Sequence, residues 1–422
     1  MVKRFALTAG LVLALSACQD GFDRSSRHLS PIPPATLSLM AAKGMTKADP
    51  IVIRSFKKES EMEIWKRGSD GKYALLKTYP ICRWSGQLGP KVKEGDRQAP
   101  EGFYAITPAQ MNPNSSFYLS FDTGYPNAYD RAHGRTGSHL MVHGSCSSRG
   151  CFAMTDEAIA EVYALGREAF VGGQRTFQFQ SYPFRMTPQN LAQHRFDPHM
   201  PFWRNLKEGS DYFETVREEP KAGVCGRRYV FGGADVAQGS CSPDVDPAVA
   251  EKSRRDEQQV AELVARGTQA IRLVYDDGGQ HQSFRQALGD TNDGGSLVVA
   301  TRPANRLGDV SRPEALASGP QEVLLDMNGK PKDAPKAAPA LAFASAKPAP
   351  QQKDAAPLPT AAPVQASAGG NDKPFYKRMF TGIGELIGVT REDPAPAAPP
   401  SPPVKAKDRR AQAAPTSTAK AN

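Results

Sequence analysis

The residues with the clearest chemical potential lie between His139 and Cys151, in the stretch HLMVHGSCSSRGC. A cysteine nucleophile needs a base or positive neighbour that favours its thiolate, donors that hold a developing oxyanion, and exposure to substrate. We expect Cys151 to be the nucleophile and His143 to accept its proton. The Cys151 amide and a neighbouring amide of the turn from Ser148 to Gly150 are the expected oxyanion donors, because Gly150 lets the backbone approach closely. Ser148 is expected to bond the backbone of this turn.

The two histidines of this stretch are expected to have different roles. His139 and His143 lie four residues apart, so in a strand their side chains would share a face and their Cα atoms would lie about 13 Å apart. Both cannot then bond one thiol. We therefore take His143 as the base and His139 as a substrate-side or structural residue. The second ring nitrogen of His143 is expected to bond a backbone carbonyl.

A zinc site is the alternative use of these residue types. Two thiols and three imidazoles, at His133, His139, His143, Cys146 and Cys151, fall within nineteen residues. However, the H-x-x-x-H spacing joins two imidazoles to one metal most readily on a helix, whereas the residues between them indicate a strand. No C-x-x-C accompanies them. We therefore predict no metal and no cofactor.

Five of the six cysteines follow the N-terminal twenty residues, and five is an odd number. In an oxidising compartment at least one thiol should then be free or paired outside the chain. Cys146 can pair with Cys151 or with Cys82, and only the second pairing leaves Cys151 reactive. Cys225 and Cys241, sixteen residues apart across glycine-rich sequence, are the candidate structural disulfide.

Short strands dominate the elements that must position the site. Alternating or apolar runs bounded by turn residues predict them at 51–56, 62–66, 73–79, 102–107, 116–122, 138–143 and 175–182. A helix is expected from Thr155 or Asp156 to Gly172, with acidic residues in its first turn. An aromatic-rich segment at 187–221 is expected to be helical, and 221–324 shows a charged helical stretch near 251–265 and an apolar alternation at 271–275. The pattern predicts a mainly β fold with helices and a helical extension.

The N-terminus predicts export and lipid anchoring. Lys3 and Arg4 precede an apolar run that is too short to span a bilayer and has the length of a secretory signal. The residues LSAC at 15–18 match the bacterial lipobox. We therefore predict a lipoprotein signal peptide over 1–17, lipidation of Cys18 and a flexible tether over 18–47. Gln19 resembles the sorting residue of outer-membrane lipoproteins, so we expect a periplasmic protein anchored to the inner leaflet of the outer membrane.

The C-terminal residues differ in composition from the rest of the 422-residue chain. Residues 331–422 hold 16 of the 36 prolines, 23 alanines, 13 basic residues and 7 acidic residues. Such a segment buries too little apolar surface to offset chain entropy, so we predict a disordered, basic Pro/Ala-rich tail over 326–422. Within it, 375–389 is either a short partner-binding helix or an apolar remnant. Since the tail carries most of the net charge of +9, we expect no nucleic-acid binding.

Two motifs resemble a known family. The run HGSCSSRGC at 143–151, preceded by APEGFYAI at 99–106, is similar to the two signatures of the YkuD-type L,D-transpeptidase catalytic domain. The resemblance covers roughly residues 50–182. Within the family, the short spacing from His143 to Cys151, the GCFAM continuation and the segment 112–135 are similar to the YafK branch of murein L,D-transpeptidases.

The resemblance implies a β-sandwich-like fold and an acyl transfer on peptidoglycan. Cys151 would attack the carbonyl at the L-centre of diaminopimelate in a stem peptide and form a thioester, while His143 would give a proton to the leaving amine. An amine acceptor would produce a cross-link and water would produce hydrolysis. The YafK branch also implies a hydrolase that releases a lipoprotein attached covalently to peptidoglycan. A non-catalytic, cell-wall-binding lipoprotein is the second alternative.

One departure from the family concerns substrate binding. Most members have Arg or Asn two residues after the nucleophile, where this chain has Ala153. Recognition of a substrate carboxylate is then expected from other residues. The candidates are Arg149, Arg131, Arg135, His139 and Tyr125. Arg149 could instead lower the pKa of Cys151 or be a solvated side chain. Tyr125 could instead be a packed loop residue.

The catalytic domain is predicted over 48–184 and the extension over 185–325.

Overall fold

The computed structural model describes residues 26–289, apart from seven positions between 233 and 244, and residues 319–332. The predicted signal peptide, Cys18, the segment at 375–389 and all of 333–422 lie outside the described residues. In the part of the chain that the structure describes, no helix is long and apolar enough to cross a membrane.

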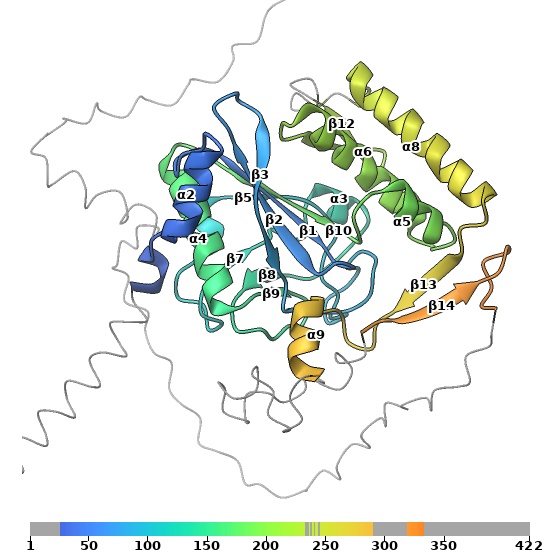
Figure 1. Ribbon diagram of the computed structural model, residues 1–422, viewed down its shortest axis with the longest axis horizontal. Helices are drawn as coiled ribbons and strands as arrows, with labels where there is room; N and C mark the ends of the chain where they lie inside the picture. Colours follow the sequence, from blue (N-terminus) through green and yellow to red (C-terminus); the bar gives the residue numbers. More distant parts are fainter. Residues whose placement is uncertain are drawn as a thin grey trace, which may run out of the picture. The chain divides into compact units, whose positions relative to one another are not determined.

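Two five-stranded sheets form the centre of the fold (Figure 1). The first has the order β3-β2-β1-β10-β5 and the second the order β4-β9-β8-β7-β6. Their strands are β1 (Ile51–Phe56), β2 (Glu61–Arg67), β3 (Tyr73–Pro80), β4 (Arg83–Trp84), β5 (Gly102–Ile106), β6 (Met111–Asn112), β7 (Ser120–Asp122), β8 (Met141–His143), β9 (Phe152–Ala153) and β10 (Phe177–Tyr182). The pairs β1–β10 and β8–β9 are parallel and the others antiparallel.

The described helices and two smaller, two-stranded sheets complete the fold. The helical elements are η1 (Arg27–Leu29), α2 (Pro34–Ala42), η2 (Pro108–Gln110), α3 (Ala128–Ala132), α4 (Asp156–Val171), α5 (Pro188–Gln193), α6 (Met200–Val216), α8 (Pro247–Ala265) and α9 (Gln282–Gly289). One two-stranded sheet pairs β11 (Lys221–Cys225) with β12 (Arg228–Gly232), and the other pairs β13 (Ala270–Val274) with β14 (Gln321–Leu325). The predicted mainly β class with helices, in a sandwich-like arrangement, is confirmed.

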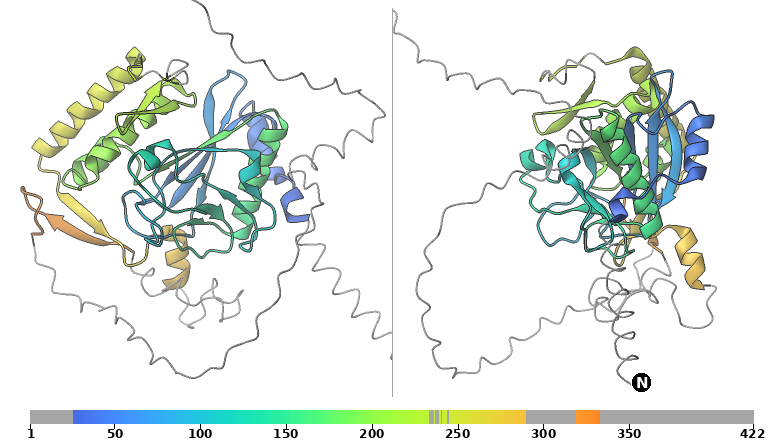
Figure 2. Two further views of the ribbon diagram at one scale, coloured as in Figure 1. Left: turned by 180° about the vertical axis from the view of Figure 1, so that it is seen from behind. Right: turned by 90° about the vertical axis from the view of Figure 1, so that its left-hand side faces the viewer.

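The core lies between the two sheets. Phe121 of β7 and Phe152 of β9 make edge-to-face contacts with Phe179 of β10, and all three rings are buried. Helix α4 contacts β1 in one sheet and β7 and β8 in the other, so it lies against both sheets along one side of the core (Figures 1 and 2). The Thr155 side chain caps this helix by accepting from the Ala158 amide, so of the two candidates, Thr155 and Asp156, the first is the cap.

Helix α6 covers the outer face of the first sheet. In β10, Gln178 and Gln180 alternate with Phe177 and Phe179, a pattern that usually leaves the polar face in water. Here both glutamines are buried as well. The extension supplies their cover, since the Gln178 amide donates to the backbone carbonyl of Pro220.

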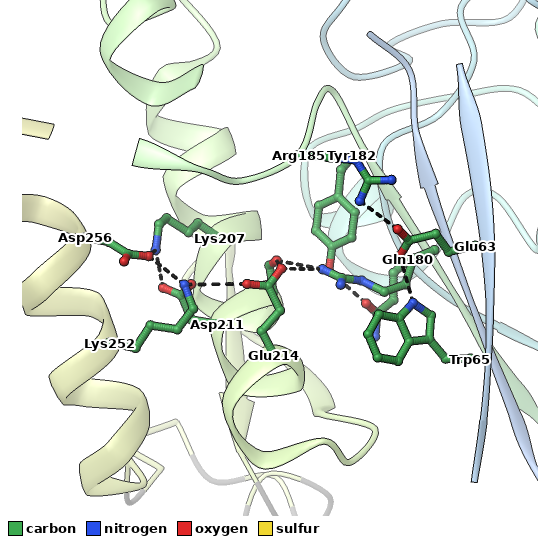
Figure 3. Close-up of polar contacts among 12 residues, drawn as sticks. Glu63, Trp65, Gln180, Tyr182, Arg185, Lys207, Asp211, Glu214, Lys252 and Asp256 are labelled. Atoms are coloured by element: carbon green, nitrogen blue, oxygen red, sulfur yellow. Dashed lines mark hydrogen bonds and ion pairs between the residues drawn. The ribbon is translucent and has the colours of Figure 1, made fainter. Parts of the chain in front are cut away.

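Charged contacts join the extension to this face. Arg54 of β1 donates to Ser210 and Glu214 of α6 at 2.8 Å and 3.0 Å. Lys207 of α6 and Lys252 of α8 both bond the carboxylate of Asp256, as Figure 3 shows. The Arg54–Glu214 ion pair therefore links the extension to the sheet, and the contacts of Asp256 join α6 to α8 within the extension.

The prediction of a flexible tether over 18–47 is wrong for residues 26–47. Ile32, Met40 and Met45 are buried in the main hydrophobic core. Arg167 of α4 donates to the carbonyls of His28 and Ser30. The segment is held by these buried apolar side chains and by the hydrogen bonds from α4.

The start of the predicted tail is also described. Residues 326–332 form a turn after β14, in which the Lys330 amide donates to the Asp326 side chain and the Lys332 amide bonds the Leu324 carbonyl. The tail prediction from 326 therefore begins several residues too early, because these residues continue the β14 hairpin edge.

Candidate functional site

The register of the second sheet brings the predicted residues to one face. His143 of β8 pairs with Ala153 of β9, so Cys151, two positions before Ala153, lies diagonally from His143 on the same face. Diagonal neighbours on paired strands lie roughly 7–8 Å apart between Cα atoms, within reach of a long side chain. The opposite face carries Val142 and Phe152, which are buried in the core.

The Cys151 thiol is half-buried and free. Its Sγ accepts from the Met141 amide at 3.5 Å and lies 3.9 Å from the carbonyl oxygen of His139. Burial raises the pKa of the Cys151 thiol, and the hydrogen bond from Met141 lowers it by less. A thiol with a raised pKa needs a base to take its proton if it is to act as a nucleophile.

The His143 ring is buried and is held by a backbone contact. Its imidazole is only 4% exposed and packs against the ring of Phe117 with centroids 4.7 Å apart. Nδ1 lies 2.7 Å from the backbone carbonyl of Gly144. Since a carbonyl can only accept, Nδ1 carries the hydrogen and Nε2 is left as the proton acceptor. The Gly144 carbonyl is the partner that the sequence could not identify.

Ser148 closes the turn that precedes the nucleophile. Its Oγ accepts from the Cys151 amide at 3.0 Å, donates to the Cys151 carbonyl at 2.7 Å, and accepts from Ser85 Oγ at 2.6 Å. The Cys151 amide is therefore occupied, which corrects its expected role as an oxyanion donor. Within the described residues, the Gly150 amide has no hydrogen-bond acceptor, so it becomes the candidate donor. Gly150 has φ +103, which a side chain would strain.

A disulfide holds the same loop. Because β8 and β9 run parallel, the residues between His143 and Phe152 must carry the chain back along the strand. Cys146 in this loop is bonded to Cys82, next to β4, with Cα atoms 5.5 Å apart. Of the two pairings open from sequence, this one leaves Cys151 as a free thiol. Cys225 and Cys241 form the second disulfide.

His139 lies outside the strand that was expected to contain it. The strand predicted over 138–143 begins only at Met141, and His139 has φ +55. The expectation that the two histidines share a strand face is therefore wrong. The His139 side chain is 82% exposed and its ring lies 4.0 Å from Asp122. It contributes its carbonyl, rather than its imidazole, to the surroundings of Cys151.

Two of the predicted substrate-binding residues are occupied in the structure. Arg135 is 8% exposed, forms a 2.8 Å ion pair with Asp130, and stacks over Tyr129 and Phe202. The Tyr125 hydroxyl is buried, and its nearest acceptors are backbone carbonyls. Both positions are corrected to structural ones, because their polar atoms already have partners inside the protein.

The other two predicted arginines are exposed. Arg131 donates to the carbonyl of Pro126, at the start of α3. Arg149 lies in the turn before Gly150 and is exposed. Of the four arginine and tyrosine candidates, Arg149 is the one whose backbone adjoins the nucleophile turn.

Sequence reasoning missed three polar residues of this region. Ser85 supports Ser148, Arg83 of β4 is the direct partner of Ala153, and the backbone of Arg97 lies beside Gly150. All three precede the cysteine by more than fifty residues, and only strand pairing connects them to it. Among the described residues, no group of three or more His, Cys, Asp or Glu side chains is placed to hold a metal ion.

Comparisons with known proteins identify the family of the region that contains these residues. The YkuD family model, the L,D-transpeptidase catalytic domain, matches residues 51–169. An Escherichia coli (strain K12) protein named "Putative L,D-transpeptidase YafK" is 38% identical over 229 residues, which cover 54% of this chain and 90% of that protein.

Two solved structures are also similar. The helical cell shape determining protein Pgp2 of Campylobacter jejuni is 15% identical, with a TM-score of 0.27, and the match covers 56% of this chain and 80% of that one. Bd1075 of Bdellovibrio bacteriovorus is 16% identical, with a TM-score of 0.26, covering 54% and 76%. The family model and the 38% identical relative carry the relationship.

Proposed function

Because this chain belongs to the L,D-transpeptidase catalytic-domain family, we propose that it is an exported, cysteine-dependent acyltransferase that acts on peptidoglycan stem peptides. The observation that supports this most directly is the shared face of Cys151 and His143, with the imidazole held in the proton-accepting tautomer. The lipobox at Cys18 supports a periplasmic location, anchored to the inner leaflet of the outer membrane.

The first half of the proposed reaction forms a thioester. Sγ of Cys151 attacks the carbonyl carbon at the L-centre of diaminopimelate, while Nε2 of His143 takes the thiol proton. The Gly150 amide faces the developing oxyanion. The carbon–nitrogen bond then breaks and the leaving amine receives the proton from His143. Proton transfer during attack suits a thiol whose pKa burial has raised.

The second half releases the acyl group. An amine acceptor attacks the thioester, His143 takes its proton, and the proton returns to the thiolate as the carbon–sulfur bond breaks. If the acceptor is a stem-peptide amine, the product is a cross-link. If water is the acceptor, the product is a free carboxylate, and a lipoprotein attached through such a bond would be released.

The test is incubation of the full chain with defined muropeptides, with and without an attached lipoprotein peptide, followed by mass spectrometry. We expect a covalent acyl adduct on Cys151 and one of the two product classes. Cys151→Ala should abolish the adduct and the turnover while keeping the thermal unfolding transition, and Ser138→Ala, at an exposed position, should change neither. Turnover by a folded Cys151→Ala protein would move the chemistry to another residue.

A further inference from the structure

A cluster of three charged residues lies beside β9, the strand that follows Cys151. Arg83 of β4 and Arg97 both donate to the carboxylate of Asp277, the latter at 3.1 Å. One carboxylate is thus shared by two guanidinium groups. Asp277 belongs to the extension, in the segment between β13 and α9.

Backbone pairing fixes this segment against the second sheet. Gly279 and Trp84 exchange two hydrogen bonds of 3.0 Å, so the segment adds a bridge to the β4 edge. A Cβ on Gly279 would lie 2.5 Å from the Trp84 ring. The Gly279–Trp84 bridge therefore requires glycine. It places Asp277 next to Arg83 and Arg97 of the catalytic domain.

The cluster adjoins the proposed reaction centre. Arg83 is the direct strand partner of Ala153, so its side chain starts from the face that carries Cys151 and His143. The backbone carbonyl carbon of Arg97 lies 3.7 Å from the position of a Cβ on Gly150, next to the nucleophile. Arg97 has φ +57, a left-handed conformation that residues other than glycine rarely adopt and that clusters at functional sites.

The cluster also has donors that the protein does not use. The Arg83 side chain is 1% exposed, and within the described residues neither its Nε nor its Nη1 has an acceptor. Buried guanidinium donors without partners are unusual. Arg97 is 35% exposed, so a ligand can reach the cluster from its side. The two guanidinium groups, the unused donors of Arg83 and the access from the side of Arg97 fit a carboxylate ligand.

We propose that Arg97 binds a carboxylate of the stem peptide and that Asp277 and Arg83 position and reinforce it. Arg97 makes the contact, while Asp277 holds its guanidinium in place and Arg83 adds positive charge behind it. This inference rests on the proposed function, since it names the group that recognises the substrate of the same site. Two stem-peptide carboxylates have the required chemistry: the one at the D-centre of diaminopimelate and the C-terminal one of the leaving D-amino acid.

The experiment measures binding separately from catalysis. The full chain carrying Cys151→Ala is titrated calorimetrically with a tetrapeptide stem, with the same peptide amidated at the D-centre, and with the peptide amidated at its C-terminus. We expect one of the two amidated peptides to bind roughly 10- to 100-fold more weakly, because charge-assisted hydrogen bonds are lost. That peptide identifies the carboxylate recognised.

The variants then assign the discrimination to the cluster. Adding Arg97→Ala should make the free and amidated peptides bind equally, and Arg97→Lys should restore part of the difference. Asp277→Asn should reduce it, while Arg254→Ala, an exposed arginine of α8, should leave it intact. Retention of the full discrimination in Arg97→Ala, or equal binding of all three peptides by the parent, overturns the proposal.

Failure of the proposed function has a different signature. If the parent discriminates through Arg97 but wild-type protein forms no adduct on Cys151, the binding site stands and the acyl transfer does not. If the adduct forms and Arg97→Ala alters no peptide preference, the acyl transfer stands and the carboxylate site is wrong.

Discussion

At Cys151, burial and a hydrogen bond act in opposite directions on the thiol. Desolvation raises the pKa because it disfavours the charged thiolate, whereas the Met141 amide favours the thiolate. Burial is the larger effect, so the pKa of the thiol lies above its ordinary value. In the proposed mechanism a general base must therefore take the thiol proton during attack. Nε2 of His143 is the candidate, because Nδ1 is bonded to the Gly144 carbonyl.

This balance predicts the pH dependence of alkylation by iodoacetamide. The thiolate is the reactive form, so the Cys151 alkylation rate should be low at pH 7 and should rise through the raised pKa, above the ordinary thiol value of about 8.5. The measurement is the modification rate at Cys151 by mass spectrometry from pH 6 to 10.5. A plateau reached below pH 7 would instead indicate a preformed thiolate–imidazolium pair.

Replacement of the base tests the assignment of the two histidines. His143→Gln removes the proton acceptor while keeping a polar side chain of similar size, and should lower the turnover number by roughly 10²- to 10⁴-fold. His139→Gln is the matched control and should stay within a few-fold of wild type, since this ring is exposed. A large loss in the His139 variant with little in the His143 variant would exchange their roles.

Among the elements, short strands do most of the positioning. Strands β4 and β9 each contain two residues, too few to be stable by themselves. The pairings β4–β9 and β8–β9, the Cys82–Cys146 disulfide and the Ser148 hydrogen bonds together fix them. The return loop between β8 and β9 can therefore hold the nucleophile in one place.

The docked segment of the extension offers a prediction at the same scale. A Cβ on Gly278 would lie 1.9 Å from the Trp84 carbonyl oxygen, at φ +84. Gly267 has nearly the same φ, +86, with nothing within 4 Å. Both alanine variants should show the backbone cost of about 1 kcal/mol, and Gly278→Ala should lose about 1–3 kcal/mol more through overpacking.

The measurements are the free energy of unfolding from urea titrations and limited proteolysis of the segment from 275 to 289. Gly278→Ala should become sensitive to the protease while Gly267→Ala should not. Equal stability losses in the two variants, without new cleavage, would mean that docking on β4 contributes little.

At the scale of the whole molecule, the extension is joined to the catalytic sheets at two places. Helix α6 bonds Arg54, and the Pro220 carbonyl after it bonds Gln178, so both cover the polar face of the first sheet. The segment with Asp277 adds to the edge of the second sheet. The described residues end with contacts of Lys332 to Leu324 and Gln269. Residues beyond this point are predicted to contribute charge and reach rather than catalysis.

Removal of residues 333–422 tests that division. The truncated protein should keep its kcat/KM on small soluble muropeptides within about twofold of the full chain. A second truncation after Asp326 removes the Leu325–Pro331 bridge and the Lys332 contacts, and should lower the unfolding temperature. Loss of activity in the first truncation, with folding retained, would show that the tail takes part in the reaction on small substrates.

Local patterns within a few dozen residues were enough to predict the strand-rich fold and the family, both of which are confirmed. The same patterns predict Cys151 as the nucleophile and His143 as its base. Spacing from His143 to Cys151, alternation in the strands and the cap at Thr155 are all readable along the chain. Only the tertiary structure showed the partner of the His143 ring, the occupied Cys151 amide and the Cys82–Cys146 pairing. It also showed how residues 26–47 pack and how Arg83, Arg97 and Asp277 come together. These contacts join residues far apart in the chain, and no local pattern specifies which distant strands will pair.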